Sequence, residues 1–440
     1  MSSTTAPAHT FQTPQQGYIA KSKYARYIDD KQRRESWPET VERFYDFAHQ
    51  HVAEHYPQAL YDWTRVEAGL HDGTRDLESM PSMRLVMTAG EAVKRNNLAA
   101  YNCCYVAINK KRKFSDMLLV LMHGTGVGFS CERQEIAHLP TVPDTIVNTD
   151  DVIVVKDSKE GWASAYYHLI THLYRGTAPK IDYSKVRPRG ARLKVFGGRA
   201  SGPEPLMRLF DFTVGVFRDA AGRKLTSIEV HDICCMIADI VVVGGGRRSA
   251  LISLSNLSDR RMRDAKSGAW WEKSNHRSLA NNSAVYTERP EAEVFMEEWL
   301  SLVKSKSGER GIFNRQAAQK QASRWGRRSA DVSYGCNPCS EVILPDNGLC
   351  NLSEAVARAG DTLDDLKRKI ERCTILGVYQ STLTDFKDVD PEFRKNAEEE
   401  RLLGVSITGV MDHPVLNTVS EQSEAWLQEL RDHARAIATK

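Results

Sequence analysis

The chain has 440 residues, of which 27% are charged and 41% hydrophobic, and its formal net charge is +3 at pH 7. This length and composition predict a globular protein with one large domain or two to three smaller ones. The near-neutral charge argues against a nucleic-acid or membrane surface and is compatible with an anionic small-molecule substrate. No apolar run approaches the ~20 residues that a membrane span needs. Nine cysteines without the spacing of a small disulfide-bonded domain indicate a reducing compartment, so we expect a cytoplasmic protein.

The N-terminal part is expected to be a disordered lead followed by helices. The first residues are polar, rich in Ser, Thr, Pro and Gln, and lack a hydrophobic signal core, so residues 1–20 are predicted to be disordered. Ser36 is a typical helix N-cap, and Pro38 suits the first turn that follows it. Apolar residues then recur at loosely helical spacing, and we predict a helical N-terminal region over residues 21–95.

Two short segments before residue 110 carry chemistry. Arg84 follows Pro81-Ser82-Met83; a guanidinium there can meet a phosphate, although a lone arginine is equally typical of a surface. Residues 101–108 predict a strand, in which side chains alternate, so that Cys103 and Cys104 point to opposite faces. The resemblance described below makes Cys103 the redox-active thiol, and the alternation then leaves Cys104 to pack in the core.

An apolar helix over residues 114–122 leads into a glycine-rich segment. Gly124, Gly126 and Gly128 occupy alternate positions, and glycine lets the backbone approach a ligand closely. The pattern alone is weak and often marks only a turn. Its position directly after the Cys103 strand favours a ligand-binding role.

Two basic segments lie farther along the chain. The first follows a predicted helix over residues 157–174, and the second follows a helix-then-strand pattern over residues 225–243. They contribute Arg187, Arg189 and Arg192, and then Gly245, Arg247 and Arg248. A solvated basic loop is an equally good interpretation of the first segment. In the second, three consecutive glycines permit two backbone states and an arginine can stack on a base, which is a physical basis for a specificity switch.

The most informative stretch is residues 334–353. Cys339 lies two residues before the carboxylate of Glu341, and a further thiol, Cys350, follows eleven residues after Cys339. Pro338 lacks an N–H and keeps this point out of a central sheet ladder, so a loop is the natural place for Cys339. The apolar residues Val342-Ile343-Leu344 predict a buried strand that leaves the loop.

Three interpretations of this stretch remain open. It can be a buried turn whose cysteines act as small hydrophobic residues. It can be a zinc site, because Cys336-x2-Cys339 has ligand spacing and Cys350 with Cys103 or Cys104 would complete the set; the absence of a second CxxC argues against this. It can also carry thiol chemistry, with a reactive cysteine, an adjacent carboxylate base and a resolving dithiol.

The C-terminal part again predicts alternating helices and a strand. Residues 355–380 form an amphipathic pattern in which Cys373 falls on the apolar stripe, so we expect this cysteine in the core. Residues 404–410 predict a strand, and residues 421–440 predict a helix.

Several blocks of the sequence together resemble the large subunit of ribonucleotide reductases. Asn337-Pro-Cys-x-Glu341, followed by Cys350-Asn-Leu, resembles the finger loop of that family, and Asn102-Cys103 resembles its second redox cysteine on the first barrel strand. Further matching blocks, in order along the chain, are Pro81–Arg84, His123–Ser130, Phe196–Pro203, Val243–Ala250, His276-Arg277 with Asn281–Ser283, and Gly308–Asn314. The resemblance covers about residues 21–410 and is closest to the monomeric, adenosylcobalamin-dependent branch that reduces ribonucleoside triphosphates.

The resemblance implies an α/β fold and a set of site residues. Residues 96–440 would form the first part of a ten-stranded α/β barrel, with a central finger loop at 335–350 that carries the radical cysteine. Cys339 would be that cysteine, Glu341 the base for the ribose 3′-OH, and Asn337 a ligand of the ribose hydroxyls. Cys103 and Cys350 would deliver two electrons and become a disulfide. The implied substrate-binding residues are Ser82, Arg84, Asn102, Gly126 and Gly128. The two basic segments named above would be the specificity loops, of which the first holds an effector nucleotide and the second lies between the effector and substrate bases.

The resemblance also implies a cofactor and partners. These are adenosylcobalamin as radical source, a ribonucleotide substrate, a deoxynucleotide effector, and a reductant of the thioredoxin or glutaredoxin type. No metal, membrane or nucleic-acid site is expected. The family's basic ATP-binding signature near the start is not seen, so on/off regulation by ATP is not expected. The family's Pro-Ser-Gly-Thr phosphate loop and later strands are not seen either. The chain is therefore expected to be a truncated or split gene product, or to have a second chain that supplies the missing half and covers the exposed sheet edge.

Two alternatives stay open at this point. The chain can be a cobalamin-independent reductase that takes its radical from a ferritin-like partner subunit with a di-metal centre. It can also be a non-catalytic remnant that binds a nucleotide or zinc.

Overall fold

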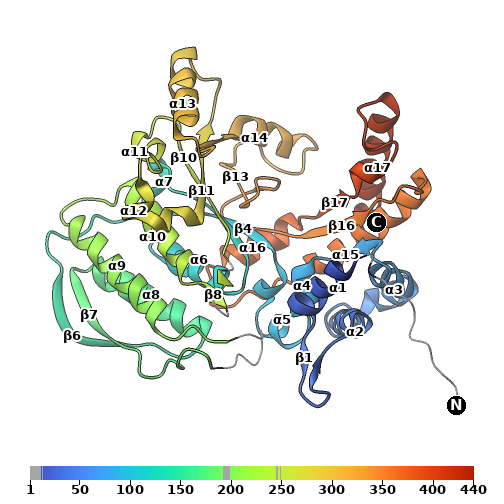
Figure 1. Ribbon diagram of the computed structural model, residues 1–440, viewed down its shortest axis with the longest axis horizontal. Coiled ribbons are helices and arrows are strands. Elements are labelled where there is room, and N and C mark those ends of the chain that lie inside the picture. Colours follow the sequence, from blue (N-terminus) through green and yellow to red (C-terminus); the bar gives the residue numbers. More distant parts are fainter. Residues whose placement is uncertain (1–10, 12, 192–198, 244–245, 248) are drawn as a thin grey trace.

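The fold is built around a six-stranded sheet that brings the two thiol-bearing strands together (Figure 1). The computed structural model describes residues 11, 13–191, 199–243, 246–247 and 249–440. The sheet has the order β12-β11-β10-β5-β4-β15. Its strands are β4 (Cys103–Ala107), β5 (Gly126–Ser130), β10 (Leu251–Asn256), β11 (Ala280–Tyr286), β12 (Gly311–Asn314) and β15 (Gly348–Cys350). The first five are parallel, and β15 pairs antiparallel with β4.

Both faces of the sheet are covered. Its strands accordingly consist almost entirely of apolar or small residues, as is typical of buried parallel sheets. The helices α6 (Arg112–Met122) and α10 (Ser227–Asp239) pack on one face. The finger-loop strands β13 (Gly335–Cys336) and β14 (Ile343–Leu344) lie on the other face. Side chains of β4 alternate accordingly, since Cys104 and Val106 join the core with the helices whereas Cys103 and Tyr105 face the finger loop.

A second, three-stranded sheet continues from β15. It contains β16 (Leu352–Val356), the parallel strand β17 (Gly404–Thr408) and the antiparallel strand β3 (Ser79–Met80). Helix α15 (Leu363–Ser381) packs on this sheet, and α17 (Glu421–Thr439) packs on α15. Helix α16 (Glu392–Glu400) lies beside β15. The expected α/β class is confirmed; the described strands form separate sheets, so the ten-stranded barrel stays a prediction.

A separate layer is inserted between β5 and β10. It consists of the parallel pair β6 (Val147–Val154) and β7 (Thr177–Asp182) with α8 (Lys159–Leu173) and α9 (Glu204–Asp219). Helix α8 packs on α6 and on α9, which places this layer outside the helices that cover the sheet (Figure 1).

The N-terminal region is mainly helical, as expected for residues 21–95. Its helices are α2 (Trp37–His55), α3 (Leu60–Arg75), α4 (Met83–Thr88) and α5 (Glu91–Arg95), and a short hairpin joins β1 (Tyr27–Ile28) to β2 (Arg33–Arg34). One part of residues 1–20, which were predicted to be a disordered lead, has regular structure. Within it, α1 (Pro14–Ile19) is helical because Thr13 and Gln16 form a reciprocal capping box at its start. Residues 1–10 and 12 lie outside the described residues.

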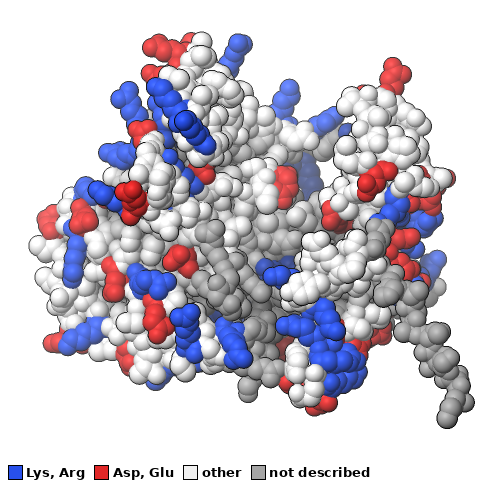
Figure 2. All heavy atoms as spheres, viewed as in Figure 1, with Lys and Arg blue, Asp and Glu red and all other residues white. Residues whose placement is uncertain are grey.

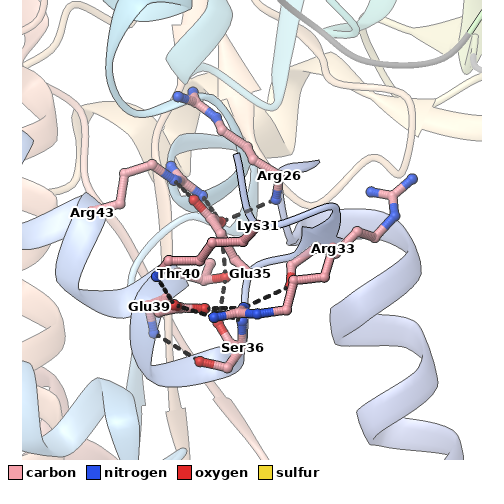
Figure 3. Close-up of polar contacts among 9 residues, drawn as sticks. Arg26, Lys31, Arg33, Glu35, Ser36, Glu39, Thr40 and Arg43 are labelled. Carbon is pink, nitrogen blue, oxygen red and sulfur yellow. Dashed lines mark hydrogen bonds and ion pairs between the residues drawn. The ribbon is translucent and has the colours of Figure 1, made fainter. Parts of the chain in front are cut away.

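A polar network ties the N-terminal hairpin to helix α2 (Figure 3), and Arg43 of that helix extends it to α4, which carries Arg84. The buried Glu35 carboxylate accepts two hydrogen bonds from the Arg43 guanidinium, at 2.7 and 3.0 Å, and one from the Arg26 backbone N–H. Burial raises the pKa of Glu35, but the bonds from Arg43 and Arg26 outweigh it and the pKa is lowered. Arg43 also donates to the Val86 and Ala89 carbonyls at the end of α4. The network thereby fixes α4, which begins directly after Ser82.

Charge on the surface is mixed. On the face in Figure 2, positive and negative side chains are interspersed, and positive ones gather at the lower right, over the β1–β2 hairpin. There the exposed Lys31 and Arg33 are paired with Glu39, at 3.0 and 2.6 Å. Within the described residues, no helix combines the length and apolar character needed to cross a membrane.

Candidate active site

The finger loop is an antiparallel hairpin whose tip carries three predicted site residues. Strands β13 and β14 pair Gly335 with Leu344 and Cys336 with Ile343. The tip between them turns sharply, with the Ser340 N–H donating to the Asn337 carbonyl at 2.9 Å and Ser340 in the left-handed region at φ 67°. Of the buried strand predicted at 342–344, the structure forms Ile343–Leu344 as β14, in which Leu344 is buried.

Asn337 organises the tip. Its side chain is fully buried; Nδ2 donates to Glu341 Oε1 at 2.7 Å, and Oδ1 accepts from the Val342 N–H at 3.0 Å. The amide therefore holds the Glu341 carboxylate in one orientation while leaving its other oxygen available. Cys339 and Glu341 are both exposed at this tip. This arrangement presents a thiol and a carboxylate base side by side.

The Cys339 thiol is held in its protonated form. Partial burial, the Glu341 carboxylate and Cys103 all raise its pKa above the ordinary value of a cysteine. A nucleophilic cysteine requires the opposite, because the thiolate is the reactive species. An intact S–H bond beside a carboxylate is instead the state from which a hydrogen atom can be removed.

Cys103 and Cys350 lie directly opposite each other in the antiparallel pair β4–β15. The hydrogen bond with Cys350 lowers the pKa of Cys103, helped by Asn337, and this outweighs burial. The pKa of the fully buried Cys350 is raised well above the ordinary value, first by its burial and then by Cys103. Neighbouring thiols of unequal pKa can close to a disulfide when one is deprotonated. All nine cysteines, each within the described residues, are free thiols.

Two of the predicted glycines make room for the finger loop. A Cβ atom on Gly128 would lie 1.8 Å from the Cys336 carbonyl oxygen, and one on Gly126 would lie 2.9 Å from Pro338 Cγ. Real Cβ atoms do not approach this closely, so β5 needs glycine where the hairpin crosses it. The sequence predicted close approach of a ligand here; the structure places the protein's own loop there, and substrate contact stays a prediction.

Three further predicted residues meet beside the start of β4 and β5. The buried Ser82 hydroxyl donates to Asn102 Oδ1 at 2.7 Å and caps α4 by accepting from the Leu85 N–H. The Asn102 carbonyl accepts from the Gly126 N–H at 2.8 Å. Arg84 donates to the Gly124 carbonyl. Ser82, Arg84 and Asn102 are therefore brought together, next to the Cys103 thiol.

The two basic segments are only partly described. Arg187 follows β7, and its Nε pairs with the Asp157 carboxylate at 2.7 Å rather than with the finger loop. Arg189 is exposed in the same loop. Arg247 belongs to β9 (Gly246–Arg247), which pairs with β8 (Val242–Val243). Arg192, Gly245 and Arg248 lie outside the described residues, so the effector site stays a prediction.

The zinc interpretation finds no support in the described residues, where no three His, Cys, Asp or Glu side chains form a group that could hold a metal ion. Cys336 is buried with its sulfur 3.6 Å from the Ser340 hydroxyl, and Cys350 is paired with Cys103. Cys104 and Cys373 are fully buried, as predicted for core residues.

Sequence reasoning missed the residues that hold the base of the finger loop. Lys113 is fully buried and contacts Asp346 and Asn347, and the buried Arg315 contacts the Tyr334 carbonyl. Lys113 ends the basic run 110–113, which is typical of a solvated segment. The one signal for its burial was its position four residues before the buried Met117, because residues four apart lie on the same face of a helix.

Three comparisons with known proteins agree with one another in the family that they indicate. Residues 138–214 match the family model of the insertion domain of B12-dependent ribonucleotide reductase. These residues largely coincide with the inserted layer of β6, α8, β7 and α9.

Two curated relatives are similar over most of the chain. An adenosylcobalamin-dependent ribonucleoside-triphosphate reductase of Lacticaseibacillus paracasei is 27% identical, over 89% of this chain and 60% of that protein. One of Lactobacillus helveticus is 28% identical, over 89% of this chain and 61% of that protein. The chain thus spans about 60% of the length of the curated relatives that it matches.

A solved structure shares the fold. The crystal structure of a B12-dependent, class II ribonucleotide reductase superposes with a TM-score of 0.75 at 24% identity, over 90% of this chain and 63% of that one. The chain therefore has the fold of a class II ribonucleotide reductase and, over 89% of its length, resembles the adenosylcobalamin-dependent ribonucleoside-triphosphate reductases in sequence.

Proposed function

We propose that this chain carries the thiol site of an adenosylcobalamin-dependent ribonucleotide reductase that converts ribonucleoside triphosphates to 2′-deoxyribonucleotides. The observation that carries the proposal is the placement of the Cys339–Glu341 tip over the Cys103–Cys350 pair. The names of the relatives, which specify triphosphates and adenosylcobalamin, support the substrate and the cofactor.

The proposed reaction gives each group of the site a role. After a hydrogen atom has left the Cys339 thiol, the sulfur takes the 3′ hydrogen atom of the ribose. Glu341, oriented by Asn337, accepts the 3′-OH proton, and the 2′-OH leaves as water. Cys103 and Cys350 supply two electrons and two protons and become a disulfide, after which Cys339 returns the hydrogen atom to C3′. The balance is one hydroxyl replaced by hydrogen, one water released and two thiols oxidised.

The cofactor proposal fits the exposure of the thiols. Cys339 is exposed, whereas Cys103 is half-buried and the other seven cysteines are buried. A radical source that approaches from outside the sheet can therefore reach Cys339 first. When bound, adenosylcobalamin supplies the radical that removes the hydrogen atom from that thiol. The matched insertion-domain model and the relatives favour this source over a ferritin-like partner subunit.

The proposal includes partners. A reductant of the thioredoxin or glutaredoxin type, or a small dithiol, would reopen the Cys103–Cys350 disulfide by thiol exchange. A deoxynucleotide would bind at the two basic segments as effector. Among the described strands, β12 and β17 each pair on one side only, so a further polypeptide segment is proposed to complete the sheets.

The test is anaerobic conversion of radiolabelled CTP and CDP with dithiothreitol, with and without adenosylcobalamin. It uses this chain alone and this chain extended by the coding region downstream. Cobalamin-dependent deoxycytidine triphosphate is the expected product. Product that forms only with a co-purifying ferritin-like protein would move the chain to the cobalamin-independent class, and no product in any arm would overturn the reductase proposal.

A substitution assigns the radical site within the same assay. Cys339→Ser should abolish turnover with little change in thermal unfolding, because the side chain is exposed. Cys373→Ala is the matched control, since it removes a buried thiol of α15 and should lower stability while turnover is kept. Substantial nucleotide reduction by Cys339→Ser would exclude the thiyl assignment.

A further inference from the structure

The base of the finger loop is held by buried charges on the side where the chain leaves the hairpin. Lys113 of α6 is fully buried, and its Nζ lies 3.0 Å from both Asp346 carboxylate oxygens and 2.5 Å from Asn347 Oδ1. Asp346 Oδ1 also accepts from the Ala107 N–H of β4 at 2.8 Å. Lys113 therefore binds the exit of the hairpin to α6, and Asp346 binds it to the strand that carries Cys103.

The side where the chain enters the hairpin is held in the same manner. Arg315 and Glu132 are both buried and form two hydrogen bonds of 2.8 and 2.7 Å. The Nε donor of Arg315 binds the Tyr334 carbonyl at 2.8 Å, directly before β13. A planar guanidinium can bind the Glu132 carboxylate and the Tyr334 carbonyl at the same time, since its donors are fixed in a fork.

Helix α16 supports the base from a third direction. Glu392, Asn396 and Glu400 are spaced by four residues and so share one face of the helix. Their side chains contact Asn347 Nδ2 at 3.1 Å, the Asp346 carbonyl at 2.6 Å and Arg328 Nε at 2.8 Å, respectively. Arg328 in turn donates to the Ile343 carbonyl of β14 at 3.0 Å.

The tip has a different kind of support. Most of its polar contacts are internal, from Asn337 to Glu341 and Val342; beyond these Asn337 bonds the Cys103 thiol, and the tip rests on β5 through glycines that offer no side chain. The position of the tip relative to Cys103 is therefore set where the hairpin is charged and anchored, at its base.

We propose that Lys113 and Arg315 are positioning residues that hold the finger loop at both ends and thereby place the Cys339 thiol beside Glu341 and Cys103. The significance for catalysis rests on the proposed reductase function, whereas the positioning itself does not. Removing Lys113 leaves the half-buried Asp346 carboxylate without its cation, so that the Ala107 N–H and the Asn109 amide alone hold it and its link to α6 is lost. The freed exit strand then lets the tip leave the sheet.

The experiment compares two buried lysines, each of which pairs with an aspartate. Lys113→Met removes the anchor, and Lys369→Met is the control, because Lys369 of α15 is also buried and pairs with Asp361 at 2.6 Å away from the finger loop. Two local quantities are measured by mass spectrometry after proteolysis: hydrogen exchange of the amides at 335–347, and the rate of iodoacetamide labelling of Cys339.

We expect the two variants to differ in the local dynamics of the finger loop. Both should unfold at a lower temperature, but only Lys113→Met should speed amide exchange at 335–347 and Cys339 labelling, each by about tenfold. Equal local rates in the two variants would overturn the proposal, because the lysine would then contribute only to global stability. Neither readout uses turnover, so failure of the reductase assay leaves this test intact.

A second variant covers the case in which Lys113→Met does not fold. Asn347→Gly keeps the backbone unstrained, because Asn347 has a φ of 60° that glycine adopts freely. It removes the contacts with Lys113 and Glu392 and should again raise exchange at 335–347 and labelling of Cys339 by about tenfold. Unchanged rates in this folded variant would equally overturn the proposal.

Discussion

At the residue scale, the thiols of this chain differ because their surroundings differ. Cys339 is exposed beside a carboxylate, Cys350 is buried, and Cys103 lies between the two environments and is stabilised as a thiolate by its hydrogen bond with Cys350. The proposed function would use the same side chain for hydrogen-atom loss at one position and for disulfide formation at another. Neighbours within a few ångströms, rather than the residue type, decide the chemistry.

A first prediction follows for the thiol pair. Mild oxidation with diamide should give one disulfide, between Cys103 and Cys350, because they face each other across an antiparallel pair. Non-reducing peptide mapping identifies the linkage, and Cys103→Ser should remove it while Cys373→Ala should not. A dominant Cys336–Cys339 disulfide would contradict the prediction.

A second residue-scale prediction concerns pH. Burial raises the pKa of Asp116 to about 7 even though Arg112 and Lys113 oppose the shift, and its Oδ2 has no hydrogen-bond partner among the described residues. Between the ordinary carboxyl pKa and about 7, the folded protein holds a proton that the unfolded chain has lost. The free energy of unfolding should therefore fall as the pH rises through this window.

The check is urea unfolding of the protein and of Asp116→Asn at pH 5 and pH 8. The asparagine does not titrate, so the stability of the variant relative to the natural chain should increase by about 2–3 kcal/mol from pH 5 to pH 8. Parallel pH profiles for the two proteins would show that the Asp116 carboxyl is not protonated in the folded state.

At the scale of elements, the close crossing of β5 and the finger loop explains why a strand of the central sheet contains glycine. Glycine weakens a strand, and it is kept where another backbone approaches closely. At Gly128 that neighbour is the Cys336 carbonyl. The crossing is the contact that places the hairpin on the sheet.

Two glycine-to-alanine variants test this crossing. Gly128→Ala should displace the finger loop and lower the free energy of unfolding by about 1–3 kcal/mol, because the new methyl group overlaps a backbone carbonyl. Gly215→Ala in α9 is the control; nothing lies within 4 Å of its added Cβ, and alanine should stabilise the helix by about 1 kcal/mol. Denaturant unfolding measures both, and a neutral Gly128→Ala variant would mean that the loop does not pack there.

At the scale of the whole molecule, one region presents apolar surface beside an incomplete sheet. Helix α13 (Ala292–Ser305) leaves Met296, Trp299, Leu300 and Val303 between 47 and 58% exposed, and Ile312 of the edge strand β12 is 54% exposed. In Figure 1 this helix projects beyond the sheet at the upper left. Exposed apolar groups next to a free strand edge are typical of a surface that another polypeptide covers.

The corresponding prediction is that this chain alone associates or binds hydrophobic dyes at micromolar concentration. Trp299→Lys together with Ile312→Lys should lower association and dye fluorescence by about twofold or more, because both charges enter the apolar surface. Tyr61→Lys, which alters an exposed aromatic residue of α3, serves as the control. Light scattering and sedimentation measure the effect, and equal association of all three proteins would locate the contact elsewhere.

Local signals in the sequence were enough to predict much of the fold. Ser36 as an N-cap, the alternation at Cys103 and Cys104, and the apolar run before Pro345 are all dictated by neighbours a few residues away. The disordered lead was misjudged at residues 14–19, because a polar segment with a capping box forms a helix despite its low hydrophobicity. Family-like motifs at the finger loop likewise indicated which thiols to examine.

By itself, then, the sequence determined the α/β class and the course of most elements, since these depend on short-range pattern. The five groups of the proposed site were indicated by the resemblance to ribonucleotide reductases. Only the tertiary structure decided how the groups are held. Lys113 belongs to what reads as a solvated basic run, and its partner Asp346 lies 233 positions away along the chain. Burial of such a pair is set by how the helix, strand and hairpin pack, and no local pattern contains that information.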